Sequence, residues 1–282
     1  MSQQFFILGC GKMGSAMLNG WLSGGAAKQT DFIIIDPYFD KSSLASQSVE
    51  SQQAVRSFAS IAEAAEAGMV RADVMLLSVK PQMMAEALAQ TDLLDISDCC
   101  FISIAAGLSI AKLTQMIGAG GDKGVRLIRT MPNTPAAIGK GMTAIIGNQA
   151  ASAADMDLAV QLLSVCGKVA RLESEAQLDA VTALSGSGPA YVFLLAEAMA
   201  QAGTDLGLSE ALARDLAEQT LYGAGALLAG ADETAAVLRE NVTSKGGTTA
   251  AALAVLMAED GMTDLLARAM KAAHERSQEL GR

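Results

Sequence analysis

Three glycines near the start of the chain have the spacing of a dinucleotide-binding turn. Gly9, Gly11 and Gly14 directly follow the apolar run 5–8 and open a helical pattern. In such loops the first glycine allows a tight turn, the second lets the backbone approach a pyrophosphate, and the third allows close helix–strand packing. An ordinary glycine-rich turn is the alternative. The position directly after a strand favours cofactor contacts at Gly9, Cys10, Gly11, Lys12, Met13 and Gly14.

Asp36 ends the second predicted strand, about 20 residues beyond the last of these glycines. An acidic side chain there accepts hydrogen bonds from the ribose diol and repels a 2′-phosphate. Asp36 precedes Pro37 and could instead stabilise a turn, and Lys41 is near enough in sequence to assist a phosphate. The sequence therefore predicts NADH or NADPH as cofactor, with a slight preference for NADH.

The strand predicted at 74–79 ends in a second segment expected at the cofactor. Ligands of such folds lie beyond the carboxyl ends of the strands, so Ser78, Val79, Lys80 and Pro81 are expected there. Lys80 could contact ribose or phosphate, or could be a solvated turn lysine. Pro81 is well placed as the first residue of a helix.

The elements that would position these residues alternate between strands and helices. Apolar runs predict strands at 5–8, 32–35, 74–79, 101–105 and 125–128, and helical spacing predicts helices at 13–22, 61–71, 82–90 and 110–117. Further strands at 142–146 and 168–172, with a helix at 153–163 between them, extend the edge. This alternation predicts an α/β Rossmann domain, a doubly wound parallel sheet, over residues 1–172.

The second half of the chain reads as all-helical. Helices are predicted at 191–203, 208–229, 234–241, 248–258 and 262–280, which gives a helical domain over residues 173–282. Alanine-rich helices with Gly223, Gly225 and Gly230 can approach one another closely, as in an intertwined homodimer. A monomeric bundle is the alternative.

Charge and cysteine usage limit the partners and the compartment. The chain has 282 residues, with 20 basic and 30 acidic side chains and a formal net charge of −10, which argues against nucleic acid or an anionic membrane as the main partner. We expect no membrane span. Cys99 and Cys100 are adjacent, and the cysteines have no metal-type spacing with His274. A reduced, cytoplasmic protein without a metal site is the expectation.

Four further segments, in order, resemble the pyrroline-5-carboxylate reductase family. They are 104–107, 129–135 (Arg-Thr-Met-Pro-Asn-Thr-Pro), 183–191 (Ala-Leu-Ser-Gly-Ser-Gly-Pro-Ala-Tyr) and 242–250 (Val-Thr-Ser-Lys-Gly-Gly-Thr-Thr-Ala). The resemblance covers nearly the whole chain, and the second and third segments are quite specific to the family.

The resemblance implies a Rossmann domain, a helical dimerisation domain and a substrate site completed by the partner subunit. The implied reaction is reduction of 1-pyrroline-5-carboxylate to L-proline by NAD(P)H, in a dimer or a higher assembly of dimers. The implied cofactor contacts also include Ala106, Asn133 and Asn241. The implied substrate contacts are Glu175, Ser244, Gly246, Gly247, Thr248 and Thr249, with Thr249 as the catalytic residue.

The chemistry of the last segment agrees with that reaction. The N–H groups of this segment lie at the start of a predicted helix and can bind a carboxylate, and the Thr249 hydroxyl can hydrogen-bond the ring nitrogen. Spacing alone favours a glycine-rich turn capped by Ser or Thr; the full family pattern reverses this and favours the site. Two residues depart from that pattern: Lys245 stands where the family usually has proline, and Met257 where it favours a polar residue.

Three alternatives remain open at this point. A β-hydroxyacid dehydrogenase carries a catalytic lysine in the first long helix after the Rossmann domain, and the helix at 191–203 has none. His274, the candidate proton donor for reduction of a carbonyl, lies in a charged stretch typical of a surface. An imine needs no such donor, because its nitrogen arrives protonated. A reductase of another cyclic imine is the second alternative. The third is a regulatory protein that senses NAD(P) without turnover.

Overall fold

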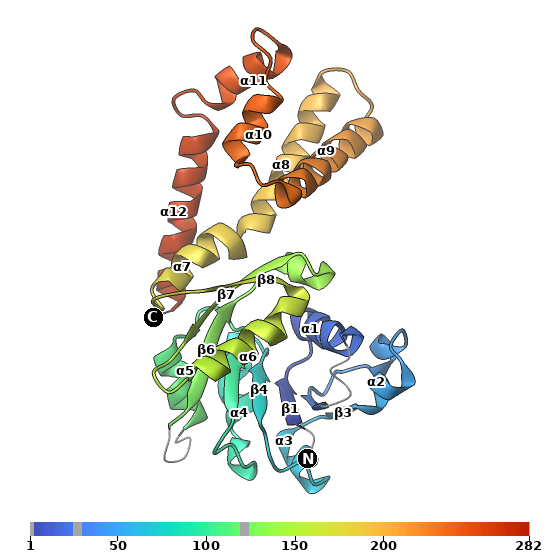
Figure 1. Ribbon diagram of the computed structural model, residues 1–282, viewed down its shortest axis with the longest axis vertical. Coiled ribbons are helices and arrows are strands. Elements are labelled where there is room, and N and C mark those ends of the chain that lie inside the picture. Colours follow the sequence, from blue (N-terminus) through green and yellow to red (C-terminus); the bar gives the residue numbers. More distant parts are fainter. Residues whose placement is uncertain (1–2, 25–29, 119–123, 282) are drawn as a thin grey trace. The chain divides into compact units, whose positions relative to one another are not determined.

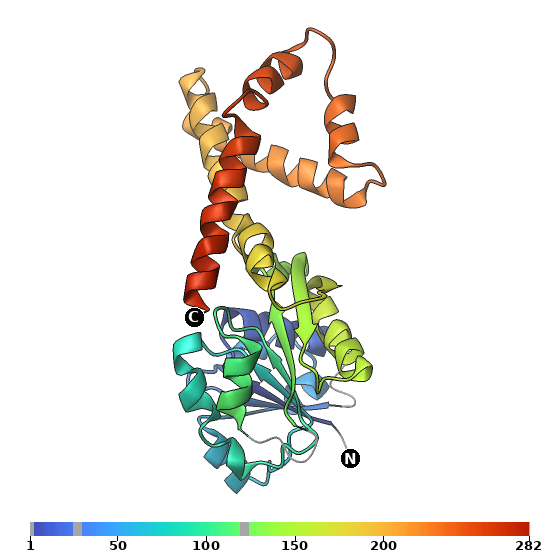
Figure 2. The same cartoon turned by 90° about the vertical axis from the view of Figure 1, so that its left-hand side faces the viewer.

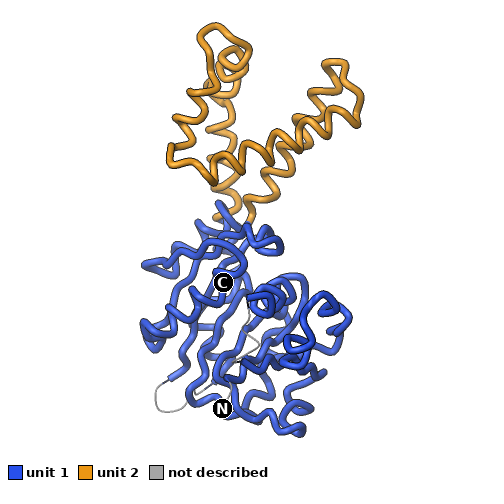
Figure 3. The backbone as a smooth tube through the Cα atoms, turned by 45° about the vertical axis from the view of Figure 1, so that its right-hand side comes forward, with its two compact units in different colours: residues 1–186, 275–282 blue, residues 187–274 orange. Residues whose placement is uncertain are grey.

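The computed structural model describes residues 3–24, 30–118 and 124–281, and their contacts form two units (Figure 3). Unit 1 comprises Met1–Gly186 and Glu275–Arg282, and unit 2 comprises Ser187–His274. The sequence placed the division at residues 172 and 173. By contacts, residues 173–186 belong to unit 1, because Asn133 hydrogen-bonds Ser185 and Gly186 lies against Met131. The end of the chain also belongs there, since Ser277 donates to Asp179.

Unit 1 is built on an eight-stranded sheet in the order β3-β2-β1-β4-β5-β6-β7-β8 (Figure 1). The strands are β1 Gln3–Leu8, β2 Thr30–Ile35, β3 Val55–Phe58, β4 Val74–Leu77, β5 Cys100–Ser103, β6 Arg126–Met131, β7 Gly141–Gly147 and β8 Gly167–Arg171. Strands β1 to β6 are parallel, β7 is antiparallel to β6, and β8 is parallel to β7. The order reverses between β1 and β4, which is where such sheets bind ligands.

Alternating side chains of the strands build two cores, one on each face of the sheet. Phe5 and Ile7 face helices α1 (Lys12–Ser23) and α6 (Ala153–Leu163). Phe6 and Leu8 face α3 (Ile61–Glu66), α4 (Met84–Leu88) and α5 (Ile110–Ile117). In Figure 2 the teal helix α4 and the green helix α5 lie on the opposite side of the sheet from the yellow-green α6. Full burial of each such side chain contributes about 1.5–3 kcal/mol.

Trp21 anchors α1 to the sheet. Its ring lies 4.7 Å from that of Phe5 and stacks on Phe32, and its Nε1–H donates to the Leu162 carbonyl at 2.6 Å. Gly20 gives α1 room to approach, since a Cβ there would lie 2.9 Å from Val165 Cγ2. Helix α1, which follows the glycine-rich turn, is therefore anchored to the sheet near its C-terminal end.

Short elements complete unit 1, and several differ from the expectation. The helix predicted at 61–71 ends at Glu66 because Gly68 takes a φ of +84°. The helix predicted at 82–90 is a 3-10 turn, Pro81–Met83, followed by α4. Strand β3 and helix α2 (Val49–Gln53) were not predicted. The remaining elements are 3-10 turns at Lys41–Leu44, Thr91–Leu93, Thr134–Ile138 and Ser164–Cys166, helix α7 (Gln177–Val181) and a π-helical turn at Thr182–Gly186.

Unit 2 is helical and is described throughout. It holds α8 (Gly188–Asp205), α9 (Glu210–Gly230), α10 (Ala235–Asn241), α11 (Thr248–Leu256) and α12 (Met262–Leu280) as far as His274. Its only buried side chains are those of Ala213 and Ala217. By length and composition alone, the helical stretch Gln177–Asp205 could cross a membrane. The same stretch carries Glu197, which lines a groove described below.

Candidate active site

The three glycines of the first loop have three different surroundings. Gly9 has a φ of +84°, and a Cβ there would lie 2.8 Å from Val79 Cγ1. A Cβ on Gly14 would lie 2.9 Å from the Gly9 carbonyl oxygen, whereas one on Gly11 would meet no described protein atom within 4 Å. Gly11 is the N-cap of α1, and no described side chain caps the first amides of this helix. The free N–H groups of the first turn thus face open space, which fits a pyrophosphate.

Asp36 closes this loop from the end of β2. Its Oδ2 accepts the Cys10 N–H at 2.7 Å, and its Oδ1 accepts the Tyr38 N–H at 2.9 Å. The carboxylate therefore shapes both the glycine-rich turn and the turn that follows β2. Each carboxylate oxygen retains a lone pair, so a ribose hydroxyl can still bind.

The Cys10 side chain lies beneath the loop. Its exposed fraction is 7%, and burial raises the pKa of its thiol to about 11. The thiol is therefore protonated at neutral pH and unreactive as a nucleophile. The backbone N–H of Cys10 bonds the Asp36 carboxylate, and the sulfur lies 3.5 Å from Ser15 Oγ.

The segment after β4 supports the loop from the next strand. Ser78 Oγ donates to the carbonyl oxygens of Leu8 (3.1 Å) and Gly9, and Val79 packs against Gly9. Lys80 is exposed and precedes Pro81, the first residue of its 3-10 turn. Ser78 and Val79 thus position the turn, while Lys80 remains accessible to a ligand.

Two further predicted cofactor residues follow β5 and β6 at the same edge of the sheet. Ala106 is exposed, beside Gly107 with its φ of +74°. Asn133 is half-buried: its Nδ2 donates to the Ser185 carbonyl at 3.2 Å and its Oδ1 accepts the Met142 N–H at 2.9 Å. The polar groups of Asn133 are therefore engaged in joining β6, β7 and the π-helical turn.

Glu175 lies in unit 1 and is already bonded. Its Oε1 accepts the Ile110 N–H and an N–H of Arg129, both at 2.7 Å. The other predicted substrate residues lie in unit 2. Arg129 was quoted in a motif but given no role. A charged residue inside an apolar strand was the available signal, because such residues are rarely buried without a partner.

The predicted substrate loop before α11 is a tight turn. The Gly247 N–H donates to the Ser244 carbonyl at 3.1 Å, and Gly246 has a φ of +73°. This is the pattern of a type II turn with glycine at its third position, where the second position favours proline. Lys245 occupies that second position, which explains physically why the family usually has proline there.

Helix α11 starts without a side-chain cap. Its first residue is Thr248, its N-cap is Gly247, and no described Ser or Thr side chain bonds the first amides. Ser244 Oγ lies so close to Gly247 that a Cβ there would collide with it. Thr249 is half-buried, and Asn241 is exposed at the end of α10. The loop offers free N–H groups and hydroxyls, which can bind a carboxylate and a ring nitrogen.

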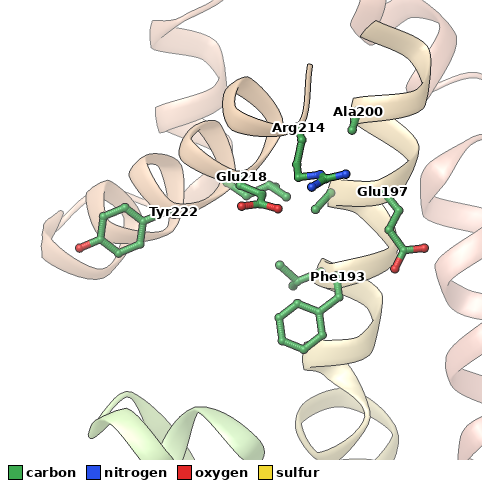
Figure 4. A pocket seen from close by; sticks show the side chains of 9 residues that line it. Phe193, Glu197, Ala200, Arg214, Glu218 and Tyr222 are labelled. Carbon is green, nitrogen blue, oxygen red and sulfur yellow. The ribbon is translucent and has the colours of Figure 1, made fainter. Parts of the chain in front are cut away.

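A groove of about 590 Å³ separates α8 from α9 in unit 2 (Figure 4). Arg214 lies between the two helices, with Glu197, Glu218 and Phe193 around it. Large apolar side chains of this unit are exposed, among them Phe193 (63%), Tyr222 (73%) and Val255 (73%). Exposed apolar patches of this kind mark interaction surfaces. The sequence pattern indicated apolar helices but not this groove.

Two family models match the chain. Residues 175–280 match pyrroline-5-carboxylate reductase dimerisation, and residues 4–107 match NADP oxidoreductase, coenzyme F420-dependent. The sequence is 36% identical to a pyrroline-5-carboxylate reductase of Synechocystis, which covers 100% of both chains. It is 43% identical to that of Haemophilus influenzae over 75% of this chain and 76% of the relative.

Solved structures give the same result. A pyrroline-5-carboxylate reductase of Coxiella burnetii is similar with a TM-score of 0.86, 29% identity and 100% of both chains covered. The Plasmodium falciparum pyrroline carboxylate reductase, solved with NADP bound, has a TM-score of 0.77 and 27% identity. That alignment covers 99% of this chain and 98% of the Plasmodium chain.

Proposed function

The chain belongs to the pyrroline-5-carboxylate reductase family, and we propose that it reduces 1-pyrroline-5-carboxylate to L-proline with a hydride from NAD(P)H. Unit 1 binds the cofactor and the loop before α11 binds the imine in this proposal. The observation that carries it is the open space at Gly11, at the switch point of a doubly wound sheet. A second support is that relatives named pyrroline-5-carboxylate reductase align with this chain over 76% to 100% of their length.

The residues of unit 1 have complementary tasks at the cofactor. The amides of Lys12, Met13 and Gly14 begin α1 and bind the phosphates. Asp36, Lys80 and the backbone at Ala106 border the rest of the site. The bound dinucleotide supplies a hydride, and these residues orient it.

The loop before α11 holds the substrate. Its free amides and the hydroxyls of Ser244 and Thr248 bind the carboxylate. The Thr249 hydroxyl, which can both accept and donate, bonds the ring nitrogen before and after hydride arrives at the adjacent carbon. The C=N bond becomes CH–NH, and no strong acid is needed because the imine nitrogen is protonated when it binds.

For the cofactor we propose a slight preference for NADH. Asp36 supports it, since its carboxylate repels a 2′-phosphate. The Plasmodium relative was solved with NADP, and Lys41 is exposed after the same strand, so NADPH is accepted as well.

We also propose that the protein is a homodimer or an assembly of dimers. Unit 2 buries only two alanines, and α11 is apolar around its whole circumference, so a second copy must cover these helices. The match to a dimerisation family over 175–280 supports this. The four cysteines are free and buried, which supports the proposed cytoplasmic location.

The direct test follows cofactor oxidation with 1-pyrroline-5-carboxylate, using NADH and NADPH in parallel. We expect imine-dependent oxidation with one proline formed per cofactor, and a higher kcat/KM with NADH. A β-hydroxyacid dehydrogenase would instead reduce NAD⁺ with a β-hydroxy acid and ignore the imine. Helix α8 carries no lysine, which supports the first outcome.

A further inference from the structure

The last turn of α12 belongs to unit 1, although most of this helix belongs to unit 2. Ser277 Oγ in that turn donates to Asp179 Oδ1 of α7 at 2.6 Å, and both side chains are half-buried (Figure 1). The two residues lie 98 positions apart in sequence, and the whole of unit 2 comes between them. The bond therefore joins the segment by which the chain leaves unit 1 to the segment by which it returns.

The same turn of α12 lies against the loop between β5 and α5, residues 104–109. A Cβ on Gly107 would lie 3.4 Å from the carbonyl oxygen of Leu280 and 3.8 Å from its Cβ. Gly281, the next residue, donates its N–H to the Ser277 carbonyl at 3.1 Å. Ser277 thus holds the helix end twice, through its hydroxyl to α7 and through its carbonyl to the residue that follows Leu280.

The apex of this loop is the part that the core does not hold. Ala105 and Leu108 pack into the core on one face of the sheet, and each is 5% exposed. Ala106 between them is exposed, and Gly107 takes a φ of +74°. Burial therefore fixes the two flanks of the loop, whereas the neighbour of its apex is the end of α12.

This apex faces one half of the cofactor in the site proposed above. The pyrophosphate is assigned to the turn at Gly11, and Asp36 after β2 is assigned to the ribose of the adenosine half. The nicotinamide half must then extend to the other side of the switch point, across β4 and β5. Ala106 follows β5, so its position affects the nicotinamide half and not the adenosine half.

We propose that Ser277, Leu280 and Asp179 form a clasp, which positions the loop at residues 104–109 for the nicotinamide half of the cofactor. Ser277 and Leu280 are positioning residues that do not touch the ligand. The bond within the clasp runs from a hydroxyl to a carboxylate, and such a bond is stronger than one between neutral groups. This role presupposes the proposed cofactor site.

The test compares Ser277→Ala with Asp179→Ala, each of which removes one side of the bond, and with their double variant. Ser164→Ala is the matched control: its hydroxyl donates over the same 2.6 Å, but to Val160 of α6, which packs on the other face of the sheet. Calorimetry measures the affinities for NADH and for ADP-ribose, which lacks the nicotinamide. Hydrogen exchange measures the opening of the loop. All are measured without imine.

We expect Ser277→Ala and Asp179→Ala to bind NADH about tenfold more weakly, because one hydrogen bond to a charged group is lost. Affinity for ADP-ribose should stay within about twofold of wild type, and the amides at 106–108 should exchange about tenfold faster because the loop opens more often. The double variant should be no worse than either single variant, since each removes the same bond. Asp179→Asn keeps an acceptor oxygen and should retain most of the affinity. Ser164→Ala should leave both affinities within about twofold of wild type.

Three outcomes would overturn the inference. Equal weakening of NADH and ADP-ribose binding would make the bond a general support of unit 1. Unchanged NADH affinity and loop exchange would mean that the loop keeps its position without the helix end. Additive losses in the double variant would separate the two residues.

Two further measurements keep the test decisive. Asp179 also lies in the first turn of α7, so if Asp179→Ala does not fold, Ser277→Ala and Asp179→Asn decide. A wild type that binds NADH but does not reduce the imine would refute the proposed reaction and would leave the comparison of NADH with ADP-ribose intact.

Discussion

The glycine-rich turn allows cofactor binding to be separated from folding with one substitution. Gly11→Val places a branched side chain in a space where no described protein atom lies within 4 Å of the new Cβ. The backbone there has a φ of −67° and a ψ of −164°, at the edge of the extended region and outside the left-handed region that requires glycine. We therefore expect a folded protein that has lost its cofactor.

The two effects differ in size. Valine is a poorer N-cap than glycine by about 0.5–1 kcal/mol, which lowers Tm by about 1–4 °C. The side chain fills the space proposed for the pyrophosphate and displaces it from two or more charge-assisted hydrogen bonds. At about 1.5–3 kcal/mol each, their loss weakens NAD(P)H binding by about two to four orders of magnitude.

Gly9→Ala is the matched control because it lies in the same turn but is expected to destabilise the fold, whereas Gly11→Val is expected to block cofactor binding. Its φ of +84° costs an alanine about 1–2 kcal/mol. Its Cβ would also lie 2.8 Å from Val79 Cγ1, an overpacking that costs about 1–3 kcal/mol. We expect a drop in Tm several times that of Gly11→Val.

Trp21 supplies the assay, since it lies on the helix that begins at Gly11 and is 3% exposed. Its emission overlaps the absorption of dihydronicotinamide, so titration with NAD(P)H quenches it. Thermal unfolding of the same samples gives Tm. Wild-type affinity in a folded Gly11→Val variant would refute the assignment of the phosphate site, and a Tm as low as that of Gly9→Ala would refute the open space.

Three other substitutions test the rest of the site. Thr249→Ala should lower kcat/KM for the imine about ten- to a hundredfold with unchanged NAD(P)H affinity, while Thr249→Ser keeps most activity; early melting with normal turnover would make Thr249 a structural residue. Asp36→Ser should raise the ratio of kcat/KM for NADPH to kcat/KM for NADH about tenfold, the equivalent of about 1.4 kcal/mol. It should also lower Tm, because two backbone N–H groups lose their acceptor. A constant ratio would leave Asp36 only its turn role. Lys245→Pro should raise the free energy of unfolding by about 0.4–1 kcal/mol, and with it Tm, because the second position of the turn accepts proline. A lower Tm in calorimetry would contradict the turn geometry.

The sequence was most informative where one physical signal dominated. Continuous apolar runs placed the central strands within a few residues, because a strand buried on both faces has few polar positions. The short strand Val55–Phe58 escaped notice since Arg56 and Ser57 interrupt its pattern at the edge of the sheet. The antiparallel direction of β7 was predictable in principle: residues 132–140 are too few for a parallel crossover.

Side-chain direction was the part that sequence could not supply. Motif order predicted Asn133 and Glu175 as site residues but said nothing of their bonds. Asn133 bonds Ser185 and Met142, and Glu175 bonds Ile110 and Arg129, which depends on how the chain folds. The glycines are the exception. Their predicted roles rest on backbone sterics and on the position of the pattern directly after a strand, and the structure has a crowded Gly9 and Gly14 with open space at Gly11 between them.

The sparse core of unit 2 has a consequence for how the protein assembles and decays. In the proposed homodimer, a unit that buries only Ala213 and Ala217 by itself gains most of its hydrophobic free energy from the second copy, so refolding from dilute solution is expected to be a second-order reaction. Apparent Tm then rises with protein concentration, and inactivation on dilution follows the rate of subunit dissociation. In a cell that makes two versions of the chain, exchange yields mixed dimers, and a damaged copy of unit 2 disables the intact chains that it captures.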